Sequence, residues 1–561
     1  MNSLRKQKVI NSALWAAAGD AIGWISELTD ESGLQRRIND TYLLKPVSWN
    51  RKIGGYSGVT VSLPAGTYSD DTQLRLAVSR SIRSNGEFDT ESFAKIELPV
   101  WLSYALGAGK ATKLAATNLM RKDTNWFSNF YKSNGIDYTN SGGNGTAMRI
   151  QPHVWSCKNL SDRKYVASVI KDSLVTHGHL IAVCGALLHA DALQYALMNG
   201  KPAGPTEING FIDNFTSVPD IIQEIYELNN FWLPNWELMS GNKLHEEIDR
   251  IRIESQTYLS KSLNAAKGYR DLSDKYKSAI NALECNKDSR RGAATNTAIA
   301  SALLCHFYKN STPYETIISC ANLLGTDTDS IGSMAGAILG CYNGIPEWNI
   351  QDSKYIISEA SRLNDIAEGI VTKNFNYPNI NKWQPPQTQS DTLVKDNGGM
   401  YHIVGLGKVT PLKLEGWKTK SYEWKWMQLE YGQTVLLKSK IGDVKIADPA
   451  QLRENDLPLK NDIVSEQPLV SKEPSRQNEL RANSQPVSNQ HKFEQNSFDY
   501  GYTDPKNLNL DDITTNLIKN GFSEREIGHY LIQFADKNGL DSCIAFAAII
   551  GKAFITRKKK Q

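Results

Sequence analysis

One stretch constrains the fold more than any other, the sequence GTDTDSIGSMAGAILG at residues 325–340. Two acids, Asp327 and Asp329, stand directly before a run of glycine, alanine and other small or apolar residues. A segment that is apolar on all sides is typical of a deeply buried helix. Carboxylates at the start of such a helix need compensation, because burying an unpaired charge is costly. The pair therefore either caps the helix or meets other groups of the fold.

A second acidic cluster has the same pattern. Ser69, Asp70 and Asp71 stand at the start of the segment 69–82, whose apolar residues have the spacing of a helix. Hard cations such as Mg²⁺ prefer oxygen ligands, so hydroxyls and carboxylates at two helix starts are suited to hold one or two ions. Capping is the alternative, since Ser and Asp are favoured at the N-cap. Capping needs only one side chain per helix, and the sequence leaves both interpretations open.

Length and composition indicate a multidomain protein of ordinary character. The chain has 561 residues, too many for one core, and its net charge of +3 favours neither nucleic acid nor membranes. Its seven cysteines are scattered without CxxC spacing, which argues against a disulfide framework or a zinc site. The apolar run at 543–555 is shorter than the ~20 residues that span a bilayer. We therefore expect a soluble, cytoplasmic protein without membrane contact.

Four regions follow one another along the chain. Residues 1–372 predict an all-α domain, because segments such as 172–197 and 296–308 are apolar on more than one face. After a Pro/Asn/Gln-rich connector, aromatic and β-branched residues between glycines predict a small β-rich domain at 392–455. Residues 456–510 have few apolar anchors and predict a disordered linker. The last region, 511–557, predicts a helical module.

Two of these regions carry finer signals. In the β-rich domain, Tyr422, Trp424 and Trp426 alternate with charged residues, so a strand places all three on one face, either as core or as a surface that stacks on a partner. In the C-terminal module, Gly521 predicts the end of one helix, and Ser523 with Glu526 forms a capping-box pattern for the next. Gly539 and Asp541 predict a further break, so three short helices are expected.

Five motifs occur in one order along the first domain. They are GDAIGWISE (19–27), SDDTQLRLA (69–77), SGGNGTAMRIQP (141–152), THGH (176–179) and the stretch at 325–340. In this order they resemble the ADP-ribosylglycohydrolase family, which includes the dinitrogenase-reductase-activating glycohydrolases. The resemblance covers about residues 8–370 and does not extend to residues 375–561.

The resemblance implies a compact all-α fold around two Mg²⁺ ions, with Mn²⁺ as an alternative, and release of ADP-ribose from a modified side chain or related conjugate. The metal ligands that it implies are Ser69, Asp70, Asp71, Asp327, Asp329 and Ser330. The catalytic carboxylates that it implies are Glu27, Asp71 and Asp329, with Glu27 as the proton carrier. The residues that it implies for ADP-ribose binding are Ser141, Gly142, Gly143, Asn144, Gly145 and His177.

Several residues also have simpler interpretations or depart from the family pattern. A glycine cluster is often just a turn, His177 alone is typical of a packed core histidine, and Asp20 is expected in a structural role. Ser69 and Ser330 stand where threonine is usual, which keeps the hydroxyl ligand. Trp24 is bulkier than expected so close to Glu27, so we expect it to narrow the cleft or stack on a ligand.

The function predicted is hydrolysis of a glycosidic bond at the ribose C1″, with metals orienting the ribose hydroxyls and the attacking water. A non-catalytic sensor or scaffold that binds ADP-ribose or a related nucleotide is the alternative. Hydrolysis of another nucleotide conjugate at the same metals is a third interpretation. The partners expected are an ADP-ribosylated protein or conjugate and a protein bound by the C-terminal helices, with nucleic acid left open.

Overall fold

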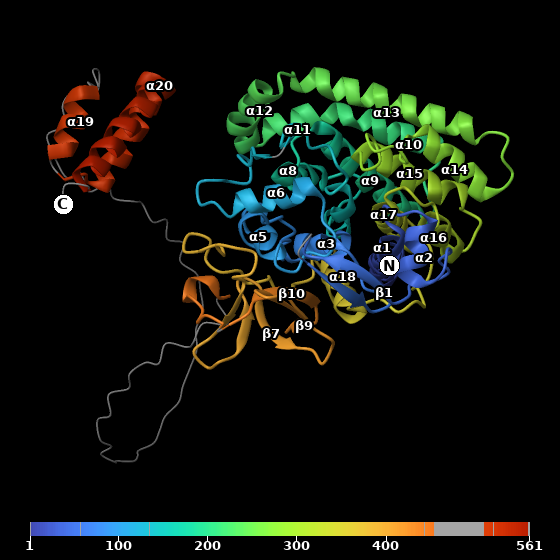
Figure 1. Cartoon of the computed structure of the whole chain (residues 1–561). Helices are drawn as coiled ribbons and strands as arrows, with labels where there is room; N and C mark the ends of the chain where they lie inside the picture. Colours follow the sequence, from blue (N-terminus) through green and yellow to red (C-terminus); the bar gives the residue numbers. More distant parts are fainter. Residues whose placement is uncertain are drawn as a thin grey trace, which may run out of the picture. The chain divides into compact units, whose positions relative to one another are not determined.

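A computed structural model describes residues 2–55, 58–133, 135–442, 444–453, 510–519 and 521–558. They fall in two compact units, one within residues 1–462 and one within residues 463–561, and each unit is described by itself. Apart from Leu510, the linker predicted at 456–510 lies outside the described residues. Figure 1 shows the chain coloured along the sequence.

The first unit begins with a large helical region, as predicted. Two short antiparallel hairpins interrupt it, β1 (Trp49–Ile53) with β2 (Val59–Leu63) and β3 (Lys132–Ser133) with β4 (Ile136–Asp137). Its α-helices are α1 (Asn2–Ser26), α2 (Glu31–Ile38), α3 (Asp70–Arg80), α4 (Thr90–Ser92), α5 (Leu98–Trp101), α6 (Lys110–Leu119), α7 (Gln151–Trp155), α8 (Val166–Thr176), α9 (Leu180–Asn199), α10 (Pro205–Asp213), α11 (Val218–Glu224), α12 (Leu233–Ser240), α13 (Leu244–Ala266), α14 (Leu272–Ala282), α15 (Ala294–Phe307), α16 (Pro313–Ala321), α17 (Thr328–Gly340) and α18 (Ser353–Ala367).

Helices α1 and α17 pack antiparallel at very short distance. A Cβ added at Gly19 would lie 2.0 Å from the carbonyl oxygen of Gly332, and one added at Gly336 would lie 2.1 Å from that of Trp15. The small residues of the stretch at 325–340 thus serve close contact between two helices. Because the helices run in opposite directions, the end of α1 lies beside the start of α17, where the acids stand.

This contact predicts a large difference between two glycine substitutions. Gly19→Ala is expected to lower the free energy of unfolding by about 1–3 kcal/mol, because its Cβ would meet backbone that cannot move freely. Gly210→Ala is the matched control, since a Cβ there has nothing within 4 Å, and alanine should stabilise α10 by about 0.5–1 kcal/mol. Urea unfolding of both variants measures the difference. Equal effects of the two substitutions would contradict the close contact.

Helix α9 lies in the core of the helical region. Among the described helices it is the one long and apolar enough to cross a membrane, but 83% of its apolar window is buried. Its Gly185 packs on α15, where an added Cβ would lie 2.3 Å from the carbonyl carbon of Ala294. The apolar segment at 172–197 is split between α8 and α9, because the chain turns at Gly178, where a Cβ would lie 2.3 Å from the ring of Tyr138.

The strand-rich region forms an antiparallel sheet in the order β10-β9-β7-β6-β5, with β8 paired to β9. Trp424 and Trp426 are 3% exposed, so these two aromatics are core residues and do not present a stacking surface. The backbone N–H of Lys438 donates to the carbonyl of Ser103, 2.9 Å away, so the sheet belongs to the same compact unit as the helices. The strands are β5 (Leu393–Lys395), β6 (Tyr401–Ile403), β7 (Gly407–Pro411), β8 (Trp417–Lys418), β9 (Tyr422–Leu429) and β10 (Thr434–Lys440). The domain boundaries at 372 and 392 stay predictions.

The second unit contains α19 (Leu510–Lys519) and α20 (Glu524–Lys558). The rings of Phe534 and Phe546 are 5.0 Å apart, and the Cys543 thiol donates to the carbonyl of Leu531 at 3.5 Å. Twelve residues of a straight helix would span about 18 Å, so the chain must reverse within α20. With α19 this gives three helical arms around a small core, in agreement with the helical module predicted at 511–557.

Candidate metal centre

The antiparallel contact of α1 with α17 brings three acids together. Glu27 follows the last residue of α1, and Asp327 and Asp329 stand at the start of α17. One carboxylate oxygen from each lies within 4.8 Å of the others. We call Glu27, Asp327 and Asp329 the carboxylate centre. Three acids at this distance repel one another strongly unless a cation or protons lie between them.

Hydrogen bonds show that these acids do more than cap a helix. Asp327 occupies the N-cap position of α17 but makes no side-chain capping bond. Its Oδ2 accepts a hydrogen bond from the Asn144 amide at 2.8 Å instead. Asp329 accepts from the N–H of Ser330 at 2.9 Å, and the Ser330 hydroxyl lies 3.8 Å from the Met148 sulfur. Capping therefore does not account for Asp327.

The second cluster, at the start of α3, faces the same space. Ser69 is the N-cap of α3, and its hydroxyl oxygen accepts from the N–H of Asp71 at 3.2 Å. Asp70 accepts from the N–H of Ala108 at 2.8 Å. Asp71 Oδ1 is buried and has no hydrogen-bond partner in the described part of the chain. Asp70 and Asp71 are not in the set within 4.8 Å, which contains Glu27 together with Asp327 and Asp329.

Asp20 has the structural role that was expected. Its two carboxylate oxygens accept the backbone N–H groups of Ser69 and Thr72, both at 2.9 Å. The N–H groups at the start of α3 have no acceptor within the helix, and a carboxylate is a good acceptor for them. Asp20 thus fixes the start of α3 against α1 and places Asp70 and Asp71.

Burial and mutual repulsion change the acidity of the whole group. Burial raises the pKa of Asp71 well above its ordinary value, and the charges of Asp20, Asp70 and Asp327 raise it further. Burial likewise raises the pKa of Asp329, with help from Glu27, Asp327 and Asp71. Burial also raises the pKa of Glu27, although Arg51 opposes this shift. The two acidic clusters therefore lie within electrostatic reach of each other.

The residues present fit a divalent metal. All the candidate donors are carboxylate or hydroxyl oxygens, which suit Mg²⁺ or Mn²⁺. Among the described residues, Asp71 Oδ1 has no hydrogen-bond partner although it is buried, as a ligand atom is before its ion is bound. Acids outnumber the cationic side chains that interact with them, so divalent cations would relieve repulsion. The acids are Asp20, Glu27, Asp70, Asp71, Asp327 and Asp329, and the cationic residues are Arg37, Arg51, Arg75 and Lys113.

The stability of the metal-free protein is expected to depend on pH. Burial raises the pKa of Asp70 from 3.8 to about 7, so between these values the folded protein holds a proton that the unfolded chain does not. This contribution to stability is fully present below pH 3.8 and is lost as the pH rises through about 7. In EDTA, the Tm measured by calorimetry should therefore rise as the pH falls from about 8 to about 6. In Asp70→Asn the Tm should change less with pH than in the wild type. An equal change would contradict the assignment of this pH dependence to Asp70.

The glycine loop (residues 141–145) lies against the carboxylate centre. The N–H of Asn144 donates to the carbonyl of Gly292 at 2.9 Å, while its side chain reaches Asp327. Gly143 forms an isolated bridge with Ala293. The hydroxyl of Ser141 is engaged within the protein, since it donates to the Asp137 carbonyl at 2.7 Å and accepts from Tyr131 at 2.9 Å.

His177 packs directly under the glycine loop. A Cβ added at Gly145 would lie 3.2 Å from its Cε1, and one added at Gly143 would lie 3.5 Å from its Nε2. Burial, together with the charge of Arg149, lowers the pKa of His177 to about 3, so the imidazole is neutral at physiological pH. His177 is thus both a packed histidine and a neighbour of the predicted ADP-ribose site.

Sequence reasoning missed several residues around this site. Arg51 of β1 pairs with Glu27, with Nη2 3.0 Å from Oε2. The indoles of Trp232 and Trp236 stack with centres 5.4 Å apart and donate to the Tyr138 hydroxyl at 2.8 Å and the Gly178 carbonyl at 2.6 Å. They support the segments that carry the glycine loop and His177. No motif marks them, because their partners lie far away in the sequence.

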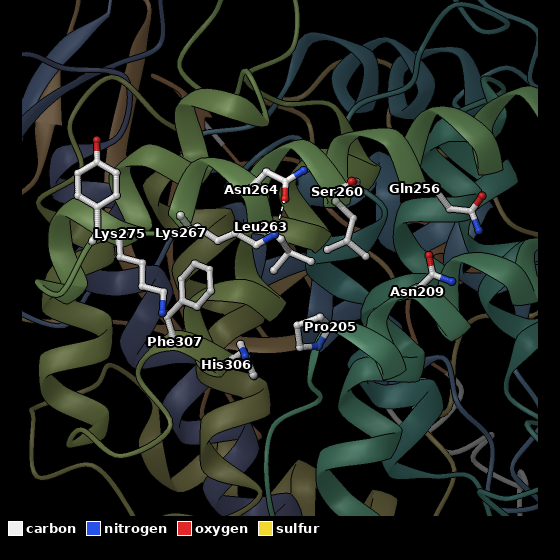
Figure 2. A pocket seen from close by; sticks show the side chains of 14 residues that line it. Pro205, Asn209, Gln256, Ser260, Leu263, Asn264, Lys267, Lys275, His306 and Phe307 are labelled. Atoms are coloured by element: carbon white, nitrogen blue, oxygen red, sulfur yellow. Dashed lines mark hydrogen bonds between the residues drawn. The ribbon is translucent and has the colours of Figure 1, made fainter.

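A pocket of about 540 Å³ opens elsewhere, between α10, α13, α14 and α15 (Figure 2). One of its two lysines, Lys267, donates to Asn264 at 2.8 Å, the bond drawn dashed in Figure 2. The ammonium of Lys275 lies over the ring of Phe307 at 4.8 Å. None of the predicted site residues lines it, so it is not the candidate site.

Comparison with known proteins identifies the family of this chain. The family model for ADP-ribosylglycohydrolase matches residues 1–377. The ADP-ribosylhydrolase ARH3 of Xenopus tropicalis is 24% identical over 302 residues, covering 52% of this chain and 78% of that protein. ARH3 of Gallus gallus is 25% identical over 289 residues, covering 50% and 70%. A solved "ADP-ribosylglycohydrolase-related protein complex" aligns with a TM-score of 0.42 and 18% identity, over 65% of this chain and 99% of that one. Because the family model matches well over half of the residues of this chain, the chain belongs to the ADP-ribosylglycohydrolase family.

Proposed function

We propose that this protein is a divalent-metal-dependent hydrolase that releases ADP-ribose from a modified protein side chain or related conjugate. The observation that carries the proposal is the carboxylate centre, in which one carboxylate oxygen of each of three acids lies within 4.8 Å of the others. Asp71 Oδ1, which has no hydrogen-bond partner among the described residues, supports it. Family membership and the similarity to ARH3 proteins support hydrolysis of an ADP-ribose linkage. The metal ligands proposed are Ser69, Asp70, Asp71, Asp327, Asp329 and Ser330, with Glu27 at the same centre.

When bound, two Mg²⁺ ions would neutralise these acids and polarise the groups at the ribose C1″. The chain's own residues would do the rest. Glu27 Oε2 is held by Arg51, which leaves Oε1 to take a proton from the attacking water. Asp71 and Asp329 would stabilise the positive charge that develops on the ribose ring as the bond to C1″ breaks.

The glycine loop would hold the diphosphate and the distal ribose. Its backbone carries no side chains at Gly142, Gly143 and Gly145, so N–H groups there can approach phosphate oxygens closely. Asn144 ties this loop to Asp327 through the bond at 2.8 Å. We propose that this bond sets the distance between the bound diphosphate and the carboxylate centre.

The test is a release assay with a panel of ADP-ribosylated proteins and nucleic acids, with and without Mg²⁺. Free ADP-ribose is expected only when Mg²⁺ is present. The Glu27→Gln variant should still bind ADP-ribose, but it should hydrolyse the conjugate far more slowly. Tight ADP-ribose binding without release from any conjugate would contradict hydrolysis and favour a sensor or scaffold. A full rate in Glu27→Gln would remove this residue as the proton carrier.

We also propose a cellular location and a binding partner for this protein. All seven cysteines are free thiols, which supports a reducing compartment such as the cytoplasm. We further propose that the second unit, with α19 and α20, binds a protein partner that brings the enzyme to its target.

A further inference from the structure

A pocket away from the carboxylate centre has the composition of an anion-binding site. It is the pocket of about 540 Å³ between α10, α13, α14 and α15, which we call the α13 pocket. Its volume lies in the range of sites that bind small organic molecules. Its basic residues are Lys267, Lys275 and His306, and none of the described residues that line it is an aspartate or a glutamate.

Lys275 of α14 brings a charged group into the α13 pocket, where its side chain extends toward Phe307 (Figure 2). Its ammonium group lies 4.8 Å from the ring centre of Phe307. Within the described part of the chain, no carboxylate oxygen lies close enough to this ammonium group for an ion pair. The contact with the ring uses the charge and leaves N–H donors for an oxygen acceptor.

His306 and Lys267 add further donors. Burial lowers the pKa of His306, and the charges of Lys309 and Lys275 lower it further, so the imidazole is mainly neutral near pH 7 and offers one N–H. The ammonium group of Lys267 gives one of its three donors to Asn264 at 2.8 Å. Two donors of Lys267 are left for a ligand.

The acids beside the α13 pocket are used in helix caps. Glu207 acts on His306 electrostatically, but its Oε2 accepts from the N–H of Gly204 at 2.9 Å in the capping box of α10. Asp271 caps α14 by accepting from the N–H of Asp274 at 2.9 Å. Neither carboxylate forms an ion pair with a lysine of the pocket, so a ligand is needed to neutralise these lysines.

The opposite wall of the α13 pocket is apolar. Leu259 and Leu263 come from α13, Pro205 comes from α10, and Phe307 ends α15. A bare inorganic ion would leave these side chains in contact with water. An aromatic or aliphatic body would cover them, which is favourable by the hydrophobic effect.

The α13 pocket and the glycine loop lie at opposite ends of α15. At the first end, the N–H of Ala294 donates to the carbonyl of Gly142 at 3.2 Å. At the other end, His306 and Phe307 line the pocket. The fourteen residues of α15 span about 20 Å, so a ligand in the pocket would not compete with one at the glycine loop.

We propose that the α13 pocket is a second ligand site, which binds a phosphate monoester that carries an aromatic or aliphatic body. A phosphate dianion matches the charges of Lys267 and Lys275, whereas a carboxylate neutralises only one of them. The N–H of His306 donates to a further phosphate oxygen, and the body of the ligand lies against the apolar wall. This site does not depend on the proposed hydrolase function.

The fluorescent probe 1-naphthyl phosphate tests the site by titration. One molecule is expected to bind per chain, and saturating ADP-ribose with Mg²⁺ should not displace it. Lys275→Met keeps the length of the side chain and should weaken binding about tenfold or more, since a charge-assisted hydrogen bond is lost. Lys277→Met, at an exposed lysine of α14 outside the pocket, is the matched control and should leave the affinity within about twofold.

A second variant tests the space itself. Ser260 lines the pocket from an exposed position on α13, so Ser260→Trp should fill the pocket and abolish probe binding while the Tm stays unchanged. Wild-type affinity in both Lys275→Met and Ser260→Trp would overturn the site. Displacement of the probe by ADP-ribose would also overturn it, because the probe would then occupy the ADP-ribose site.

Three further ligands separate the contributions of the head group and the apolar body. 1-Naphthoate and 1-naphthol carry the same rings with a carboxylate or a hydroxyl group, and inorganic phosphate lacks the rings. Each should bind about tenfold more weakly than 1-naphthyl phosphate. Equal affinity for 1-naphthoate or 1-naphthol would overturn the assignment to phosphate, and equal affinity for inorganic phosphate would overturn the role of the apolar wall.

Discussion

The double substitution Asp327→Asn with Asp329→Asn is expected to abolish Mg²⁺ binding and to lower ADP-ribose release by about a thousandfold or more. It removes two of the three acids whose oxygens lie within 4.8 Å of one another. Asparagine keeps the shape of the side chain but supplies no charge to hold a cation. Calorimetry with Mg²⁺ measures the first effect, and the release assay measures the second.

Stability separates this loss from misfolding. In EDTA the double variant should be at least as stable as the wild type, because burial and neighbouring charges raise the pKa of Asp329, and removing that charge relieves repulsion. Asp365→Asn, at an acid paired with Lys6 at 3.0 Å, is the control and should leave Mg²⁺ affinity unchanged. Wild-type Mg²⁺ affinity in the double variant would show that the centre does not hold the metal.

Much of this site follows from local pattern. Asp70 and Asp71 are the first two residues of α3, and Asp327 and Asp329 flank Thr328 at the start of α17, as the change from polar to apolar residues predicts. The small residues of α17 indicate a close helix contact, and Gly19 and Gly332 provide it. That α1 is the partner of α17, with Glu27 at its end, follows only from the resemblance to the family, because spacing along the chain carries no information on which helices meet.

Other features depend on contacts that no local pattern encodes. Arg51 lies in the hairpin of β1 and β2, 24 residues from Glu27, and pairs with it only once that hairpin folds onto α1. The sheet follows the helical region in the chain, and Arg80 donates to Gln433 of the sheet region, 353 residues away in the sequence. Long-range pairs of this kind are set by packing of the finished fold. Local sequence patterns do not reveal that Arg80 of α3 and Gln433 of the sheet region belong to one buried cluster.

That cluster carries the largest stability effect we expect. Glu97→Ala should lower the free energy of unfolding by about 3–5 kcal/mol, because it leaves the buried charge of Arg80 without its partner. Arg80 donates to both Glu97 oxygens at 2.8 Å, and the pair is 1% and 0% exposed. The hydroxyl of Tyr377 donates to Glu97 at 2.6 Å, so the substitution also frees the segment that leads into the sheet. Urea unfolding of the full chain measures the loss.

Two further variants decide whether charge or volume causes that loss. Combining Arg80→Met with Glu97→Leu replaces the pair by apolar groups and should recover most of the stability, since no charge is then buried. Asp123→Ala, at the exposed pair with Arg121, should leave unfolding unchanged. Because Arg80 ends the helix that begins with Asp70, Glu97→Ala should also weaken Mg²⁺ binding, whereas the recovered double variant should not. An unstable double variant with normal Mg²⁺ affinity would contradict this coupling between the sheet and the metal centre.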